Sequence, residues 1–434
     1  MIKLNRKKLL TASAVVAVMG LATAAIPAQG FTPRSVDGVS ATEIKLGITI
    51  PMTGSASLGY NKVPDAMKAY FAYVNANGGI NGRKISLVVK NDEYVPTKAV
   101  TLTNELILKD KVFALLSPLG TANVKAVAAS VNPARRGVPV LFVNTGFSGF
   151  ADKKKYSTTF SILPSYIMEA KIMSQYIKDN FPDKKVALLY QDDDFGSDAL
   201  AGFKLGGLSF VKTVPYASGS QGIATAPPTW ITALKASGAD VVILFGVSSA
   251  TAAALGTAAK MGYAPQWVLG SVGGDATTIK LAINTSAVLY NAVGASFLPA
   301  TTDTTDEYVK LFQDINTKYN NAVAFDNNVL VGMNTAFVAA QAIKAAGTNP
   351  TRASLIKAIE SQGASFASAG LVPLNYSSSS HVGYNGYWFG KYTLTGDLKA
   401  PASGYTVYTT DSGSGAVVKS TYKRPAMPAK GLPN

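Results

Sequence analysis

Short apolar runs alternate with helix-like stretches from residue 44 to residue 143. Four of these runs fit buried strands, at residues 44–50, 85–89, 112–116 and 138–143. Stretches with helical spacing follow at residues 60–77 and 97–109 and from Thr121 onward. The unit of strand, loop and helix recurs roughly every 25 to 35 residues, which predicts a doubly wound, mostly parallel α/β sheet.

The same alternation restarts after residues 160–164. A helical stripe runs from Tyr166 to Ile177, and another helix is expected to begin at Ser197. Further strands are expected at residues 186–190, 210–214, 241–245 and 267–269, with helices at 229–236, 250–261 and 276–282. Two successive α/β lobes of similar size are the economical interpretation.

The last third of the chain has a different pattern. Helices are expected at residues 306–319, 327–346 and 351–361 with no strand between them, so they are expected to complete the first lobe. The aromatic run YNGYWFGKYTL at residues 384–394 predicts a late strand or hairpin near the lobe boundary. Residues 411–434 are rich in Gly, Ser, Pro and Lys and predict a mobile or wrapping tail.

The N-terminus has the features of a secretory signal peptide, expected to span residues 1–28. Four basic residues precede a long apolar stretch at residues 9–25, and residues 22–24 (ATA) offer a cleavage site. An uncleaved anchor is the alternative, although the apolar stretch is short for a membrane span. Cleavage after Ala28 would leave 36 basic and 25 acidic residues, which lowers the net charge from +15 to +11.

Composition excludes several classes of chemistry. The 434 residues contain no cysteine, which rules out disulfides, cysteine zinc sites, thiol nucleophiles and lipid anchoring at a cysteine. The single histidine, His381, leaves little room for a histidine metal site or a Ser-His-Asp triad. His381 lies in a serine-rich loop and is expected to be a surface imidazole. The basic residues are scattered, so no nucleic-acid partner is expected.

Motifs of nucleotide binding and hydrolysis are absent: the sequence has no G-x-G-x-x-G after the first strand, no G-x-x-x-x-G-K-[ST] and no G-x-S-x-G. Asp192, Asp193 and Asp194 suggest a metal site, but adjacent loop residues cannot all face one ion, so a structural or rim role is expected. Asp92 either orients a ligand or forms a turn, and the turn is favoured. The sequence therefore predicts no enzyme activity, no cofactor and no metal.

Small polar loops recur at the ends of the predicted strands. Such loops line the crevice at the carboxyl edge of an α/β sheet. They offer hydroxyls and backbone N–H groups but few general bases, which favours binding over catalysis. The candidate ligand-binding residues are Ser55, Tyr60, Pro118, Leu119, Gly120, Thr121, Asn144, Thr145, Gly146, Phe195, Val247, Ser248, Ser271 and Val272. Two facing crevices would form a cleft that closes on a small solute.

The loop at residues 117–120 is the best candidate for an anion seat. A buried strand runs into this small-residue turn, and a helix is expected to begin at Thr121. The free N–H groups and the positive end of the helix suit a carboxylate. The alternative is that Thr121 only caps an ordinary helix.

Five stretches carry a family likeness. They are TEIKLGITIPMTGSAS, VNANGGINGRKISLVVKNDEYVPTKAV, FALLSPLGTANVKAVA, GVPVLFVNTG and VALLYQDDDFGSDAL. Together they resemble the periplasmic solute-binding proteins of branched-chain amino acid and amide uptake systems, the Leu/Ile/Val-binding-protein-like group. The order GGINGR then YQDDDFG is the specific part, and the likeness covers residues 42–290 well and the remainder loosely.

The resemblance implies two Rossmann-like lobes joined by three crossovers near residues 162–164, 296–299 and 370–373. The lobes would comprise residues 42–162 plus 297–370 and residues 163–296 plus 371–410. It also implies a monomeric periplasmic protein that delivers its ligand to ABC permease and ATPase subunits. In the amino acid binders, hydroxyls and N–H groups of the first lobe hold the carboxylate. That role carries over to Thr121 and Thr145, and Phe195 stands where an aromatic residue covers the ligand.

The chain departs from the family pattern where an ammonium group would bind. The family has a Tyr and a Glu after two second-lobe strands, but the matching places here read FGVS at residues 245–248 and GSVG at residues 270–273. A serine of the carboxylate loop is replaced by Pro118 or Leu119. Burying an ammonium without a partner is costly. An ordinary α-amino acid is therefore in doubt, and an apolar or aromatic carboxylate, or an amide, is favoured.

The leading hypothesis is an extracytoplasmic solute-binding protein that delivers a small ligand to an ABC importer by cleft closure. The ligand would be a hydrophobic amino acid, an amide or an aromatic or aliphatic carboxylate. The alternative is a ligand sensor of the same fold that feeds a receptor or regulator. An enzyme acting in the cleft is disfavoured because histidine is nearly absent and cysteine is absent.

Overall fold

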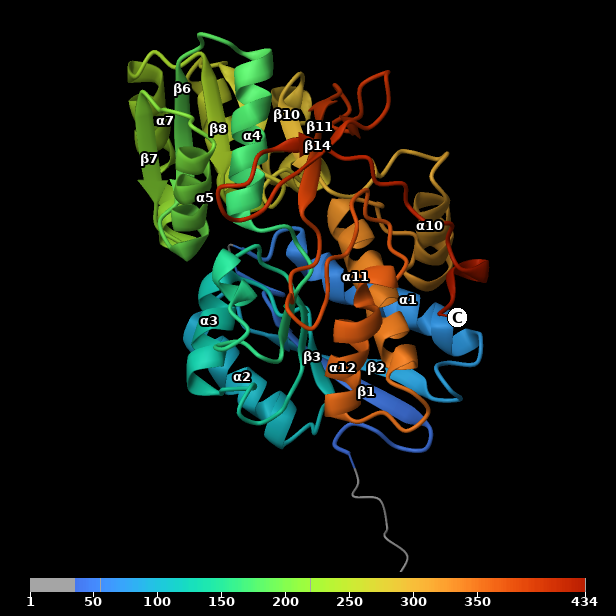
Figure 1. Ribbon diagram of the computed structural model, residues 1–434. Coiled ribbons are helices and arrows are strands. Elements are labelled where there is room, and N and C mark those ends of the chain that lie inside the picture. Colours follow the sequence, from blue (N-terminus) through green and yellow to red (C-terminus); the bar gives the residue numbers. More distant parts are fainter. Residues whose placement is uncertain (1–35, 55, 219, 434) are drawn as a thin grey trace, which may run out of the picture. The chain divides into compact units, whose positions relative to one another are not determined.

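The computed structural model describes residues 36–54, 56–218 and 220–433. The expected signal peptide at residues 1–28 and the candidate residue Ser55 lie outside these ranges. A five-stranded parallel sheet forms the first lobe, in the spatial order β2-β1-β3-β4-β5 (Figure 1). Its strands are β1 (Glu43–Ile50), β2 (Lys84–Asn91), β3 (Ala114–Leu116), β4 (Val140–Val143) and β5 (Thr159–Ser161). The strand order reverses between β1 and β3, and ligands bind at such a switch point.

Helices cover both faces of this sheet. On one side lie α2 (Pro96–Leu108) and α3 (Thr121–Ser130), which pack on each other. On the other side α1 (Val63–Ala76) packs against α11 (Asn327–Ala345) and α10 (Glu307–Tyr319), and α12 (Arg352–Gln362) packs on α11 (Figure 1). The three late helices pack on this face together, since α11 is buried on nearly every side and needs partners all around it.

A nine-stranded sheet forms the second lobe, with its main path in the order β14-β13-β11-β10-β9-β8-β6-β7 and β12 beside β11. The parallel strands are β6 (Val186–Gln191), β7 (Lys212–Tyr216), β8 (Val241–Phe245), β9 (Gln266–Leu269) and β10 (Val293–Ser296). The antiparallel additions are β11 (Gly386–Tyr392), β12 (Leu398–Lys399), β13 (Val407–Thr409) and β14 (Val418–Lys419). All five residues of β8 are buried, as expected for a central parallel strand covered on both faces.

The helices of the second lobe follow its parallel strands. They are α4 (Tyr166–Asn180), α5 (Asp194–Leu205), α6 (Ser220–Thr225), α7 (Pro227–Ala236), α8 (Ser248–Lys260) and α9 (Ala276–Ile283). The strand order here reverses between β6 and β8, so the loops after these two strands lie at the second switch point.

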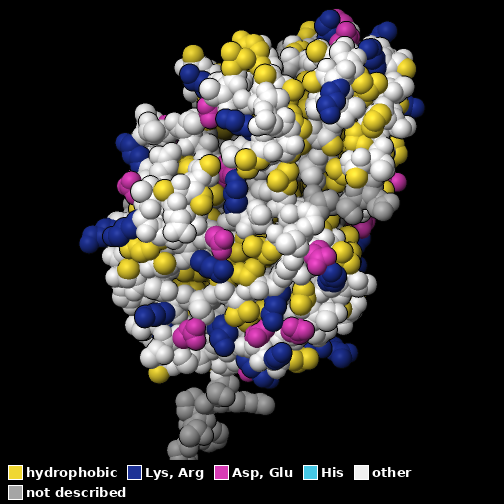
Figure 2. Space-filling model, turned by 180° about the vertical axis from the view of Figure 1, so that it is seen from behind, with side chains coloured by type: hydrophobic (Ala, Val, Ile, Leu, Met, Phe, Trp, Pro, Cys, Tyr) yellow, Lys and Arg dark blue, Asp and Glu magenta, His cyan; other side chains and the backbone are white. Residues whose placement is uncertain are grey.

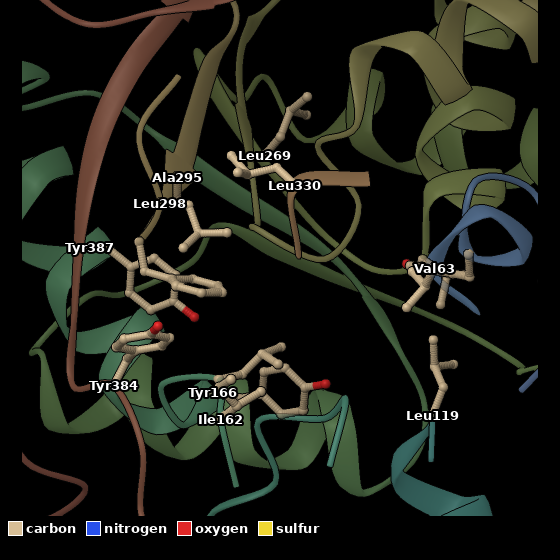
Figure 3. Close-up of a cluster of buried hydrophobic side chains, with 14 of the residues drawn as sticks. Val63, Leu119, Ile162, Tyr166, Leu269, Ala295, Leu298, Leu330, Tyr384 and Tyr387 are labelled. Carbon is tan, nitrogen blue, oxygen red and sulfur yellow. The ribbon is translucent and has the colours of Figure 1, made fainter. Parts of the chain in front are cut away.

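Three segments connect the lobes, between β5 and α4, between β10 and α10, and between α12 and β11. They are bonded to one another: the Leu371 N–H donates to the Phe297 carbonyl at 2.9 Å, and the Tyr384 N–H donates to the Ile162 carbonyl at 3.1 Å. Figure 3 shows Tyr384 and Leu298 among the side chains of the buried cluster that these segments share. The lobe boundaries predicted from the sequence stay predictions.

The C-terminal segment, described over residues 411–433, runs from the second lobe to the first (Figure 1). At one end the buried Lys171 ammonium of α4 binds the segment beginning at Asp411. Further on, Arg424 pairs with Asp306 at the start of α10. At the far end the Tyr70 hydroxyl of α1 donates to the Gly431 carbonyl at 2.8 Å. Of the two predicted forms of this tail, these contacts describe the wrapping one.

The prediction of a surface imidazole at His381 is wrong. The side chain is fully buried, its ring stacks on Phe160 with centroids 3.8 Å apart, and Nδ1 lies 3.0 Å from the Thr159 carbonyl. Nε2 lies 3.0 Å from a Glu360 carboxylate oxygen. Burial lowers the pKa of His381, which favours the neutral ring. The polar serine loop folds back against β5, a long-range contact that a local pattern does not reveal.

One smaller prediction changes, and the favoured turn role of Asp92 is confirmed. The strand predicted at residues 210–214 lies at 212–216, because Phe210 packs edge-on against Phe203 of α5 instead of entering the sheet. Asp92 acts as a turn residue, since its buried carboxylate accepts from the Tyr94 N–H at 2.9 Å and from the Asn123 amide at 3.1 Å.

The visible surface mixes charge and apolar groups. On the face in Figure 2, Lys and Arg side chains alternate with Asp, Glu and hydrophobic ones instead of forming a single basic stripe. Within residues 36–433, apart from the two positions left undescribed, no helix combines the length and the apolar character needed to cross a membrane.

Candidate functional site

Loops at both switch points meet at a small cavity between the lobes. Its volume is about 20 Å³, enough for roughly one water molecule. The residues that line it are Tyr60, Tyr94, Leu119, Gly120, Asn144, Tyr166, Phe195, Val247 and Val272. Seven of these nine were candidates from the sequence. Tyr94 and Tyr166 were not, because their places depend on how the loop after β2 and the start of α4 fold back toward the cleft.

The predicted anion seat is built from the loop after β3 and the start of α3. Thr121 is the first residue of α3, and Gly120 is the N-cap with φ 100°, so no side chain caps this helix. The alternative that Thr121 serves as the cap is therefore wrong. A Cβ at position 120 would come within 2.7 Å of the Tyr94 ring, which explains the glycine. The first turn of α3 keeps its N–H groups available to an anion.

Hydroxyl groups lie directly beneath this seat. The Thr121 and Thr145 hydroxyl oxygens are 2.7 Å apart, and the Tyr166 hydroxyl donates to Thr145 Oγ1 at 3.3 Å. Both threonines are buried. Close packing requires glycine at position 146, because a Cβ there would lie 2.6 Å from the Pro164 carbonyl oxygen.

Pro118 lines a different small cavity beneath α3, not the cleft. Its backbone serves the cleft nonetheless, since its carbonyl accepts from the Asn144 N–H at 3.0 Å, and the Gly120 N–H donates to the Asn144 carbonyl at 3.3 Å. These bonds hold the loops after β3 and β4 side by side, so both predicted loops contribute to one wall.

Aromatic side chains form the rest of the cleft wall. Tyr166 and Phe195 pack with centroids 4.4 Å apart, and Tyr60 donates its hydroxyl to the Val272 carbonyl at 2.9 Å. Burial raises the pKa of Tyr60 to about 12 and raises the pKa of Tyr94 and Tyr166 further. All three phenols are therefore protonated and uncharged at neutral pH.

A hydrogen-bond chain behind the wall orients the second-lobe loops. Asp193 caps α5 by accepting from the Phe195 N–H at 2.9 Å, and its other oxygen accepts from the Gln191 amide at 2.7 Å. The Tyr216 hydroxyl donates to the Gln191 amide oxygen at 3.2 Å and accepts from the Val247 N–H at 3.0 Å. Burial raises the pKa of Asp193. Asp193 thus has the structural role predicted for the acidic run.

Ser248 and Ser271 lie at the cleft loops but do not line the small cavity. Ser248 donates to the Val272 carbonyl at 3.3 Å. Ser271 donates its N–H and its hydroxyl to the two carboxylate oxygens of Glu169, at 2.6 and 3.0 Å. Glu169 is fully buried on α4, and burial raises its pKa to about 7. Glu169 could not be identified from the sequence, because a single Glu in an apolar helical stripe carries no local signal.

Several contacts join the lobes around the cleft besides the three connections and the Tyr166–Thr145 bond. Two of them are the Tyr60–Val272 bond described above and an ion pair between Lys125 of α3 and Asp194 of α5. The Ser148 N–H and hydroxyl donate to the Asp198 carboxylate at 2.6 and 3.0 Å.

A further contact joins the start of α9 to the start of α11. There the Asp275 carboxylate accepts from the Asn327 N–H at 3.2 Å. Together these bonds hold the cleft closed.

No cluster of three or more His, Asp or Glu side chains suited to a metal ion occurs among the residues that the structure describes. The cavity itself is lined by hydroxyls, one amide and apolar groups. The arrangement can bind and enclose a small solute.

Comparisons with known proteins agree with this geometry. A family model described as periplasmic binding protein matches residues 43–397. Among the similar proteins, the "Leu/Ile/Val-binding protein homolog 7" of Brucella suis biovar 1 (strain 1330) is 26% identical over 317 residues, which cover 68% of this chain and 75% of that protein.

Two solved structures show the same fold. The branched-chain amino acid transporter substrate binding protein of Streptococcus pneumoniae, in complex with isoleucine, has a TM-score of 0.70 at 19% identity and covers 87% of this chain and 100% of that one. An ABC transporter solute binding protein of R. palustris, in complex with 4-hydroxybenzoate, has a TM-score of 0.67 at 19% identity. The match covers 82% of this chain and 95% of that one.

These neighbours have two lobes and are substrate-binding proteins, not enzymes. The family model spans most of the chain, and the two switch-point crevices face each other as in a protein that closes on a ligand. The chain therefore belongs to the periplasmic binding protein family.

Proposed function

We propose that this protein is the ligand-binding component of an ABC importer. Family membership supports an extracytoplasmic location, and the predicted signal peptide supports export to the periplasm. Permease and ATPase subunits as partners and a monomeric state are part of the proposal. The bonds across the cleft support delivery by opening and closing, since each can form only when the lobes meet.

We propose further that the ligand is an apolar or aromatic carboxylate without an amine. The observation that carries this is the cavity lining: none of its nine residues bears a charge, while the first turn of α3 is left uncapped. An ammonium group would need a buried acceptor. The carboxylates of Asp193 and Glu169 have their oxygens occupied by hydrogen bonds within the second lobe.

The fold relatives represent both ligand classes. The R. palustris protein is in complex with 4-hydroxybenzoate, a ring-bearing carboxylate, and the four aromatic residues of this cavity suit such a ring. The S. pneumoniae protein is in complex with isoleucine and represents the competing class. The missing ammonium partners in this chain favour the first class.

Ligand entry requires the lobes to separate. A cavity of about 20 Å³ holds roughly one water, far less than a benzoate-sized solute needs. Binding is therefore expected to proceed from an opened form, with closure around the ligand restoring the bonds across the cleft.

The test is a thermal-shift and calorimetric screen of refolded, ligand-free protein. The panel contains benzoate, 4-hydroxybenzoate, octanoate, Leu, Ile, Val and short amides. A true ligand at about a hundred times its dissociation constant should add roughly 2.7 kcal/mol of stability. Stabilisation by carboxylates that lack an amine is expected. Stabilisation by the amino acids alone would overturn the assignment of ligand class.

A variant localises the binding. Thr121→Val should weaken carboxylate binding about tenfold, because a hydrogen bond to a charged group is lost. Thr101→Val on the exposed face of α2 is the matched control and should leave affinity unchanged. Equal affinities for the two variants would contradict the anion seat.

A further inference from the structure

A groove of about 550 Å³ lies on the second lobe between the end of α4 and β11. Tyr176 of α4 and Phe389 of β11 stack in it with centroids 4.3 Å apart and an interplanar angle of 28°. Tyr290 and Leu394 stand at its rim with 53% and 62% of their surfaces exposed. A concave groove lined by aromatic and apolar side chains is typical of a small-molecule site.

Two lysines give the groove a positive end. Lys391 lies two residues after Phe389 on β11, so both side chains point to the α4 face of the sheet. Lys399 of β12 is directly opposite Lys391 in the antiparallel register, and both line the groove. Like charges directly opposite each other destabilise a strand pair.

Neither lysine has a counter-ion in the part of the chain that the structure describes. Among the described residues, no ion pair or side-chain hydrogen bond involves Lys391 or Lys399. The neighbouring carboxylate of Asp397 accepts from the Thr395 hydroxyl at 2.7 Å and pairs with neither ammonium. A bound anion would remove the repulsion that the strand pairing creates.

We propose that this groove is a second ligand site, which takes an amphiphilic carboxylate. The carboxylate lies between Lys391 and Lys399, and the apolar body lies on the Tyr176–Phe389 stack. The volume falls within the range of small-molecule sites, about 300 to 1,000 Å³. The concave shape and the paired cations fit a free fatty-acid-like molecule.

This site is separate from the cleft. Tyr176 is ten residues beyond the cleft residue Tyr166 on the same helix, which corresponds to about 15 Å along α4. Ligand binding in the groove is therefore independent of ligand binding in the cleft, which the proposed function uses.

The test uses dodecanoate as the probe, on the full chain. Calorimetry should detect dodecanoate binding, and a diazirine-bearing dodecanoate should label residues 389–401 and the end of α4. Charge reversal by Lys391→Glu with Lys399→Glu should weaken dodecanoate binding at least about tenfold and confer binding of dodecyltrimethylammonium. Binding of the cleft ligand should stay unchanged, which separates this test from that of Thr121.

The control reverses two other exposed strand lysines of the same sheet, Lys212→Glu with Lys419→Glu. Equal dodecanoate affinity in the two double variants, or labelling confined to the cleft loops, would overturn the proposal. Co-sedimentation with phosphatidylglycerol vesicles distinguishes the source of the anion. If vesicles bind through the two lysines while free dodecanoate does not, the groove serves a lipid surface and the proposed free ligand is wrong.

Discussion

Glu169 buries a carboxyl group without a cationic partner among the described residues. Its oxygens accept from the N–H and hydroxyl of Ser271, so it holds the loop after β9 on which Val272 reaches the cleft. Burial raises the pKa of Glu169 to about 7 from the usual 4.5. Hydrogen bonds from Ser271 lower it but do not offset the burial.

Glu169→Gln should remove a pH-dependent part of stability. The folded state holds the Glu169 proton up to about pH 7 whereas the unfolded state releases it near 4.5, so this group makes the unfolding free energy fall as pH rises between those values. Between pH 4 and pH 8, the unfolding free energy of the variant should therefore rise by about 3 kcal/mol relative to that of the wild type. Urea unfolding across that range measures it.

Ser271→Ala is the control for this prediction. It leaves the Glu169 carboxyl and the backbone N–H bond in place, so the pH dependence should persist. A Glu169→Gln curve parallel to the wild type at every pH would show that Glu169 does not titrate as stated.

The helix α4 is the element on which most features of the second lobe converge. Ser165 caps it by accepting from the Met168 N–H at 3.1 Å. Its first turn supplies Tyr166 to the cleft, and its last turns supply Tyr176 to the groove. Between them Lys171, a residue only 3% exposed, anchors the C-terminal segment through its ammonium group.

Lys171→Met should detach the start of the tail from α4. The ammonium donates to the Asp411 carbonyl and carboxylate at 3.0 Å and to the Gly413 and Gly415 carbonyls at 2.7 and 2.8 Å. Losing these charge-assisted bonds should cost about 2–3 kcal/mol of unfolding free energy. Urea unfolding gives the cost, and hydrogen exchange at residues 411–434 should rise.

Lys178→Met on the same helix is the matched control. Lys178 is exposed, and its ammonium donates to a single carbonyl, that of Gly206, at 2.5 Å. Removing it should change the unfolding free energy by no more than about 0.5 kcal/mol. Unchanged exchange of the tail in the Lys171 variant would contradict its role as an anchor.

At the scale of the whole molecule, hydrogen bonds and one described ion pair link the lobes across the cleft. The side chains of the ion pair, Lys125 and Asp194, are 32% and 45% exposed. A pair so exposed contributes little, since solvent screens it. The Ser148–Asp198 contact is more enclosed, and burial raises the pKa of Asp198 to about 6.

Asp198→Ala should weaken ligand binding about tenfold while leaving the fold intact. Its bonds to Ser148 link the two lobes, so under the proposed function their loss should shift the population toward an open form and reduce the apparent affinity. Calorimetry measures the affinity, and small-angle scattering with saturating ligand should still show compaction.

Asp314→Ala on the exposed side of α10 is the control, and its affinity should match the wild type. If Asp198→Ala also matches the wild type, the Ser148 contact plays no part in closure.

Several cleft residues could be predicted because they follow strands directly. Gly120, Asn144, Phe195 and Val247 lie just past the ends of parallel strands, and those ends meet at one edge of each sheet. The local pattern of apolar runs therefore located them without knowledge of the tertiary structure.

Tyr94 and Glu169 could not be predicted in the same way. Tyr94 reaches the cleft because the loop after β2 adopts positive φ angles and packs on Gly120. Glu169 acts through Ser271, which is 102 positions away in sequence. Contacts over such distances are set by which lobe surfaces pack together.

The sequence by itself determined the α/β class, the two lobes and the start of a helix at Thr121, because periodicity and helix starts are properties of neighbouring residues. Only the tertiary structure decided the burial of His381, the wrapping of the tail and the closing bonds across the cleft. Each of these joins segments that are distant in the chain. Their free energy comes from desolvation and geometry that exist only once both lobes have folded.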